Sequence, residues 1–95
     1  MNSRERFRLK LGEIASQIES HRLERFKFLC KDLIPEGDVE RILSPEALFI
    51  ELEHRMLLGP NQVEFVRQCL IQVGRNDLAF ELMAFDEKRG GEKIK

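Results

Sequence analysis

The chain has 95 residues, of which 42% are hydrophobic and 35% charged, and its net charge is −1. This length predicts one small domain with a modest core. The near-zero charge argues against strong non-specific binding to nucleic acid, and no apolar run of about 18 residues is present to predict membrane insertion.

The first residues of the chain are charged and lack the apolar segment of a secretion signal. Cys30 and Cys69 are far apart and form no Cys-x-x-Cys pattern, so we expect two reduced, mostly buried thiols. Together these features predict a cytoplasmic protein, because structural disulfides belong to oxidising compartments.

The first predicted helix covers about residues 3–19. Its apolar residues recur at helical spacing and predict a buried seam made of Phe7, Leu11, Ile14 and Ile18. Gly12 lies in the interior of this helix, where glycine costs about 1 kcal/mol relative to alanine. It therefore indicates either the close approach of another backbone or a dent in the surface.

The second predicted helix covers about residues 20–33, with Ser20 as its expected N-cap. Its buried stripe is expected to consist of Leu23, Phe26, Cys30 and Leu33. Each residue of a helix is rotated by about 100° from the one before it, which puts Phe28 about 160° from the centre of that stripe. Phe28 should therefore face solvent unless another segment covers it.

Phe28 and Leu29, which lies at the edge of the stripe, predict a small exposed apolar patch. Basic side chains surround it: Arg25, Lys27 and Lys31. The alternative is that the N-terminal segment or the C-terminal tail buries Phe28, since single exposed apolar residues are common on protein surfaces.

Four further helical segments follow. Residues 35–43 predict a turn with at most a short helix, and Ser44 with Pro45 marks the start of the next one. The apolar face of that helix is predicted to include Leu48, Leu52 and Met56, and its expected solvent-facing residues are Glu51, Glu53 and Arg55. A fifth helix is predicted to have an Asn61–Glu64 capping box, and Asn76 opens a sixth whose inner face includes Leu78, Leu82, Met83 and Phe85.

The predicted elements make an all-α antiparallel bundle, since no alternating strand pattern occurs. We expect one domain over residues 1–87. Residues 88–95 are too polar and glycine-rich to pack, so they predict a flexible C-terminal tail or linker.

The charges are unevenly distributed along the chain. Residues 1–33 carry eight Lys/Arg and five Asp/Glu, a net charge of +3, whereas residues 34–66 carry two and seven, a net charge of −5. This pattern indicates either ordinary solvated faces or two complementary patches that meet between molecules.

The residues do not predict an enzyme. His21 and His54 have no partner at metal-ligand spacing on their own helix faces, and no glycine-rich phosphate loop is present. A catalytic site needs a nucleophile beside a base or paired acids in a pocket, and neither is indicated. We therefore expect no catalytic residue, metal or cofactor, and interpret the chain as a binding module.

Two stretches resemble death effector domains, which belong to the death-fold superfamily. They are residues 26–30, Phe-Lys-Phe-Leu-Cys, and residues 74–78, Gly-Arg-Asn-Asp-Leu. The resemblance matches Phe28 and Leu29 to the family's Phe-Leu patch, and Arg75, Asp77 and Leu78 to its Arg-x-Asp-Leu motif. Residues 49–59 also look like the fourth helix of such domains in initiator caspases and their inhibitory homologues.

The resemblance implies a six-helix Greek-key bundle that binds other death effector domains in apoptotic signalling. Its implied partners are adaptors, initiator caspases, inhibitory homologues or further copies of itself, without nucleic acid or membrane insertion. The family's patch enters a groove between helices one and four of a neighbour, where Gly12 replaces a larger residue. The alternative functions are a decoy or scaffold that blocks assembly or binds a kinase, and the prodomain of a protease.

The sequence departs from the family at the start of the second helix. Relatives usually have an acid there that pairs with the arginine of the sixth helix, whereas this chain has Arg22, which would repel Arg75. Glu19 or Glu24 could supply the missing negative charge. The alternative for Arg75 and Asp77 is a solvated first helical turn, in which Asp77 is favoured by the helix dipole.

Overall fold

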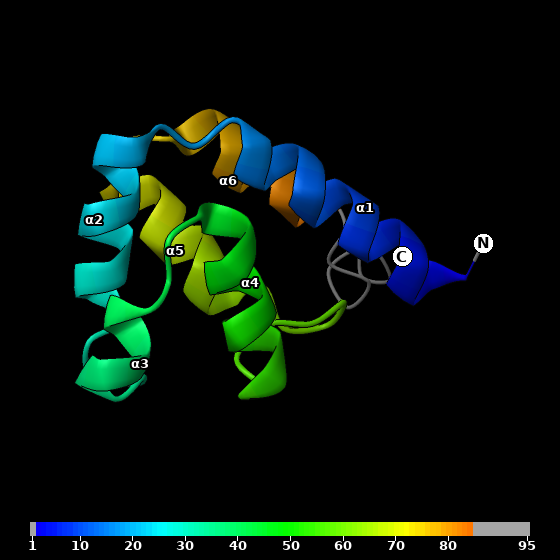
Figure 1. Cartoon of the computed structure of the whole chain (residues 1–95). Coiled ribbons are helices and arrows are strands. Elements are labelled where there is room, and N and C mark those ends of the chain that lie inside the picture. Colours follow the sequence, from blue (N-terminus) through cyan, green and yellow to red (C-terminus); the bar gives the residue numbers. More distant parts are fainter. Residues whose placement is uncertain (1, 85–95) are drawn as a thin grey trace.

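The computed structural model describes residues 2–84 and contains six helices in that range (Figure 1). They are α1 (Ser3–Ser16), α2 (Ser20–Leu29), α3 (Glu36–Glu40), α4 (Pro45–His54), α5 (Glu64–Gln72) and α6 (Asn76–Met83). The predicted all-α six-helix bundle is therefore confirmed. The predicted tail over residues 88–95 and its boundary at residue 87 lie outside the described residues, as does Phe85.

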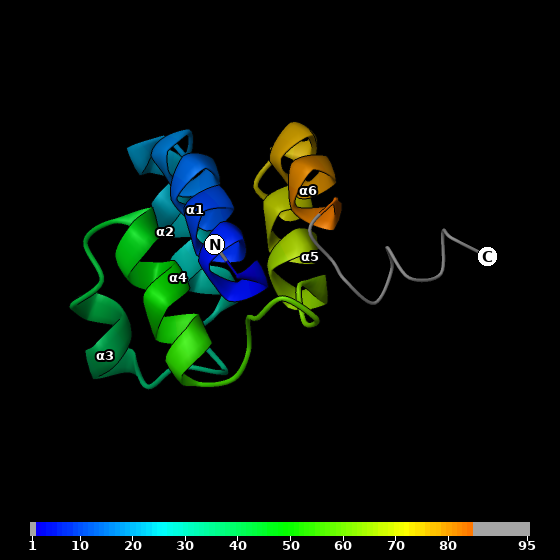
Figure 2. The ribbon, with the colours of Figure 1, turned by 90° about the vertical axis from the view of Figure 1, so that its right-hand side faces the viewer.

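The helices pack around α1. It contacts α4 on one side and α6 on the other, and α5 packs against both α6 and α2 (Figure 2). The short helix α3 lies at the far end of α2 from the α1–α2 connection (Figure 1). Within residues 2–84, no helix is both long and apolar enough to span a bilayer.

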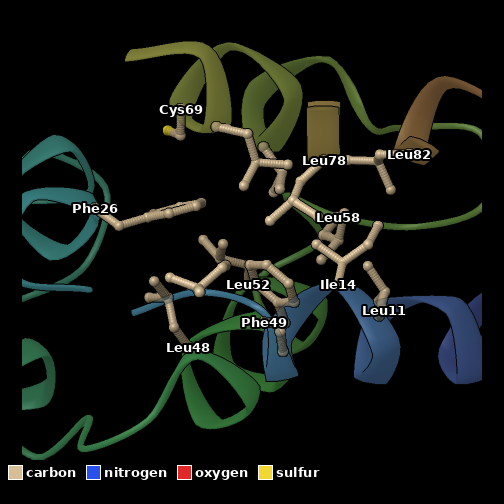
Figure 3. Packing of buried hydrophobic residues seen from close by; sticks show 14 of the residues in the cluster. Leu11, Ile14, Phe26, Leu48, Phe49, Leu52, Leu58, Cys69, Leu78 and Leu82 are labelled. Atoms are coloured by element: carbon tan, nitrogen blue, oxygen red, sulfur yellow. The ribbon is translucent and has the colours of Figure 1, made fainter. Parts of the chain in front are cut away.

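The core joins apolar side chains from most of the helices (Figure 3). Five of the residues that the periodicity predicted to be buried are at most 1% exposed: Phe7, Ile14, Phe26, Leu52 and Leu82. Val66 and Leu70 of α5 are fully buried as well. Cys30 and Cys69 are free and buried, as expected. A hydrogen bond with Cys69, together with burial, raises the pKa of the Cys30 thiol, which suppresses its thiolate.

Helix starts agree with the sequence only in part. Ser44 caps α4 as predicted, accepting a hydrogen bond from the Ala47 amide at 3.1 Å. The predicted caps Ser20 and Asn61 are wrong. Ser20 is already inside α2, and α5 begins only at Glu64, because residues 59–62 form a closed turn with paired backbone hydrogen bonds of 3.0 and 3.1 Å. A capping box that was not predicted joins Asn2 and Glu5 at the start of α1.

Two predicted core positions are exposed instead. Leu33 is 43% exposed and Met56 is 76% exposed, whereas Ile34 and Leu58 take the inward positions. Both errors lie beyond a helix end: α2 stops at Leu29, and Met56 has a φ of 62° after α4 has ended. Once the helix ends, the 3.6-residue period no longer sets the direction of a side chain.

We predict that Phe26→Ala lowers the free energy of unfolding by about 3–5 kcal/mol, because it removes a fully buried ring from a close-packed core. The matched control is Phe28→Ala, which removes the same ring from an exposed position and should cost less than about 1 kcal/mol. Urea denaturation of the two variants measures both values. Equal losses would contradict the assigned orientation of α2.

Candidate interaction site

The first candidate surface surrounds Phe28 on α2. Its side chain is 68% exposed, and the Lys31 ammonium lies 5.8 Å from the centre of its ring, within the range of a cation–π contact. The alternative that the N-terminal segment buries Phe28 is therefore wrong for the described residues. The alternative of burial by the tail concerns residues outside that range.

The other predicted members of this patch differ in their exposure. Arg25 and Lys31 are exposed, whereas Leu29 is half-buried and packs against the core. Lys27 is only 12% exposed at its side chain, because its ammonium donates a hydrogen bond of 2.8 Å to the Ile42 carbonyl. Lys27 thus connects α2 to the segment before α4. We define the α2 patch as Phe28 with Arg25 and Lys31.

The second candidate surface is a groove of about 190 Å³ between α1 and α4. Its residues are Arg8, Leu11, Gly12, Glu46, Phe49, Ile50 and Glu53. A β-carbon added to Gly12 would meet no heavy atom within 4 Å, so this glycine leaves a dent and does not permit a close backbone contact. We call this the α1–α4 groove.

Glu53 was predicted to face solvent, and this prediction is wrong. Its side chain is 7% exposed, and one carboxylate oxygen lies 3.4 Å from the Arg8 guanidinium. Its other oxygen, Oε2, is buried and accepts no hydrogen bond from any residue in the range 2–84. The i,i+4 spacing from Phe49, which is buried, was the sequence signal for this position.

A third cluster joins the start of α6 to the α1–α2 connection. The Arg75 guanidinium makes two hydrogen bonds to Asp77, of 2.8 and 3.0 Å, one of 3.0 Å to Glu19, and one to the Gln17 carbonyl. The same Glu19 oxygen also accepts a hydrogen bond of 2.8 Å from Arg22. Of Glu19 and Glu24, the two residues that could replace the family's acid, Glu19 is the one that bonds to both arginines.

Arg22 has a second partner that accounts for its position. Its guanidinium donates to the Val73 carbonyl at the end of α5. Gly74 follows with a φ of +83°, and a β-carbon there would lie 2.9 Å from the Arg22 guanidinium. The left-handed backbone favours glycine here, and a larger residue would also displace the end of the Arg22 side chain. The expected repulsion between Arg22 and Arg75 is offset by the carboxylate that they share.

The structure also changes the role of Leu78. It is fully buried, so it belongs to the core and is not available to a partner, although it lies in the predicted motif. Asp77 remains 58% exposed at its side chain, whereas Arg75 is 16% exposed. Asp77 is therefore the most exposed of these residues, followed by Glu19, whose side chain is 47% exposed.

The helical bundle with an exposed aromatic patch and a separate groove has the form of a protein-interaction domain. The family model of the death effector domain matches residues 7–88. The chain belongs to the death effector domain family. Domains of this family are non-enzymatic interaction modules, in agreement with the interpretation of the sequence as a binding module.

Relatives from the same family cover most of this chain. It is 33% identical to mouse caspase-8 over 72 residues, which are 76% of this chain and 15% of that protein. It is 32% identical to the human FAS-associated death domain protein over 72 residues, 76% of this chain and 35% of that protein. It is 25% identical to the mouse CASP8 and FADD-like apoptosis regulator over 87 residues, which are 92% of this chain and 18% of that protein.

The chain therefore spans between 15% and 35% of the length of these three relatives, with the largest share in the FAS-associated death domain protein. No solved structure matches it with comparable significance.

We predict that Arg75→Gln raises the pKa of Asp77. Hydrogen bonds from Arg75 hold that pKa at about 2, below its ordinary value of 3.8. Because the folded-state pKa is lowered, the carboxylate stabilises the fold above about pH 4, and this contribution is lost as the pH falls towards 2. The variant should lose less stability than the wild type across that window.

Carboxyl-carbon NMR titration gives the pKa of Asp77 directly, and urea denaturation at several pH values gives the stability. An Asp77 midpoint near 3.8 in the unaltered protein would show that its bonds with Arg75 do not form in solution.

Proposed function

We propose that this domain is a homotypic interaction module in apoptotic signalling, which inserts its α2 patch into the α1–α4 groove of another death effector domain. The exposure of Phe28 carries this proposal. The Phe28 ring is 68% exposed, so the isolated domain leaves a large apolar surface in contact with water. Burial of that surface in an apolar pocket of a partner would contribute strongly to the free energy of binding. Family membership supports the homotypic nature of that partner.

The groove has the chemistry to receive such a ring. Leu11, Phe49 and Ile50 give it apolar walls, and Gly12 leaves its floor open. The acidic side chains Glu46 and Glu53 line the same groove, whereas the patch carries Arg25 and Lys31. Apolar complementarity would supply affinity, and the opposite charges would orient the two domains.

No residue belongs to both the patch and the groove, so each molecule can use both surfaces at once. Such a head-to-tail contact is heterologous, and it propagates unless its rotation closes a ring. We therefore propose oligomeric assembly, and we place the partners among proteins such as caspase-8, the FAS-associated death domain protein and other copies of this chain.

The Arg75 cluster has a secondary part in this proposal. Its arginines are engaged within the domain, so they hold α6 against the α1–α2 connection. Asp77, with its side chain 58% exposed, is the member that would contact a neighbouring domain.

A second candidate function is inhibition of such assembly. The likeness to the CASP8 and FADD-like apoptosis regulator covers 92% of this chain, more than either of the other two relatives covers. Adding substoichiometric domain to a growing assembly of another death effector domain distinguishes the two functions. An assembling module lengthens the product, whereas an inhibitor leaves short oligomers.

We predict that Phe28→Ala and Gly12→Leu each abolish self-assembly, but that the two variants mixed together form a one-to-one complex. The first variant keeps only its groove, and the second keeps only its patch. Leucine at position 12 would fill the dent without a clash at its β-carbon, and it should stabilise the helix by up to about 1 kcal/mol.

Light scattering of each variant and of the mixture measures this outcome, and circular dichroism confirms that both remain folded. Phe80→Ala is the matched control, because Phe80 is 75% exposed on α6 and belongs to neither surface. The docking mode is wrong if Phe28→Ala assembles normally, or if the mixed variants fail to combine.

We also predict that binding weakens as salt increases. The Debye length falls from about 10 Å at 0.1 M to about 3 Å at 1 M, which screens exposed basic and acidic groups from each other. Calorimetry of the mixed variants across this range measures the effect, and a dissociation constant that is unchanged or falls would exclude steering by these charges.

A further inference from the structure

The α1–α4 groove holds a carboxylate that its own chain leaves incompletely paired. Glu53 is 93% buried at its side chain, since only 7% is exposed, and its Oε2 accepts no hydrogen bond from any described residue. A buried acceptor without a donor is destabilising, and a buried charge is tolerated mainly when it is paired. The Glu53 carboxylate therefore still lacks a donor, and a cation close to it would stabilise it.

Arg8 does not supply that donor to Oε2. It approaches the other oxygen, Oε1, at 3.4 Å, and its own side chain is 64% exposed. The remaining groove residues are apolar side chains, a glycine and the acid Glu46, and none of them donates a hydrogen bond to Oε2. The groove thus fits a ligand that carries an apolar group with a positive charge next to it.

The α2 patch has that combination. The Lys31 ammonium lies 5.8 Å from the centre of the Phe28 ring, so an apolar and a cationic group lie side by side at the C-terminal end of α2. Lys31, which follows the end of α2, is exposed, whereas Lys27 within α2 is already bonded to the Ile42 carbonyl. Of the two lysines, Lys31 is therefore the one that can reach a neighbouring molecule.

We propose that Glu53 is the specificity-determining residue of the groove, and that its carboxylate pairs with the Lys31 ammonium of a second copy of this chain. This inference rests on the proposed docking of Phe28, which would bring Lys31 to the groove. A partner with an aromatic residue but no adjacent cation would bury the Glu53 carboxylate unpaired, and it would be rejected for that reason.

The complex between Gly12→Leu and Phe28→Ala isolates one interface for the test, because each copy contributes one working surface. Glu53→Gln is added to the copy that provides the groove, and Lys31→Gln to the copy that provides the patch. Each change alone should weaken binding by about tenfold, as expected for a charge-assisted hydrogen bond. Both together should weaken it by little more than either alone, since they remove the same contact.

Two controls match these changes. Glu46→Gln alters an exposed acid of the same groove, and Arg25→Gln alters the other exposed cation of the patch. Neither should show coupling in the same double-mutant cycle. Coupling of Glu53 to Arg25 in place of Lys31, or independent effects of Glu53→Gln and Lys31→Gln, would overturn the inference.

If Glu53→Gln fails to fold, Lys31→Glu tests the same contact, because position 31 is exposed and tolerates substitution. It should weaken binding more than Lys31→Gln, since it would set two carboxylates against each other. Unchanged affinity in both Lys31 variants overturns the inference. Absence of any complex between Gly12→Leu and Phe28→Ala would instead overturn the docking mode itself.

Discussion

Phe26 and Phe49 meet edge to face, with ring centroids 5.9 Å apart and planes inclined by 62°. Phe26 is fully buried and fixes the rotation of α2, so Phe28, two residues later, must point to solvent. Phe49 belongs to α4 and forms one wall of the α1–α4 groove. A single aromatic contact thus joins the helix that presents the patch to the helix that shapes the groove.

The rigidity of this contact matters for binding. A patch and a groove on separate helices can repeat from molecule to molecule only if their relative orientation is constant. Close packing of the core restricts that orientation, because interiors pack as densely as organic crystals. The cluster of Arg22, Glu19 and Arg75 adds a second restraint by linking the α1–α2 connection to the ends of α5 and α6.

The sequence was sufficient for the helices, the core and the exposure of Phe28, because each depends on a local period. It also located Gly12 as a surface dent or a close contact, and the structure selected the dent. Helix ends were predicted less well. Leu33 and Met56 were assigned inward positions by extending the helical period past the residues where the helices stop.

Tertiary packing decided the details of the charged residues. Lys27 bonds to a carbonyl that is distant in sequence, Arg22 shares Glu19 with Arg75, and Glu53 lies buried beside α1. A sequence period specifies which face of its own helix a side chain occupies, but not which neighbouring helix covers that face. Local helical periods are therefore enough to locate the helices and the outward Phe28. The pairing of the charges and the carboxylate left in the groove depend on how the helices pack, because those contacts join atoms from separate helices.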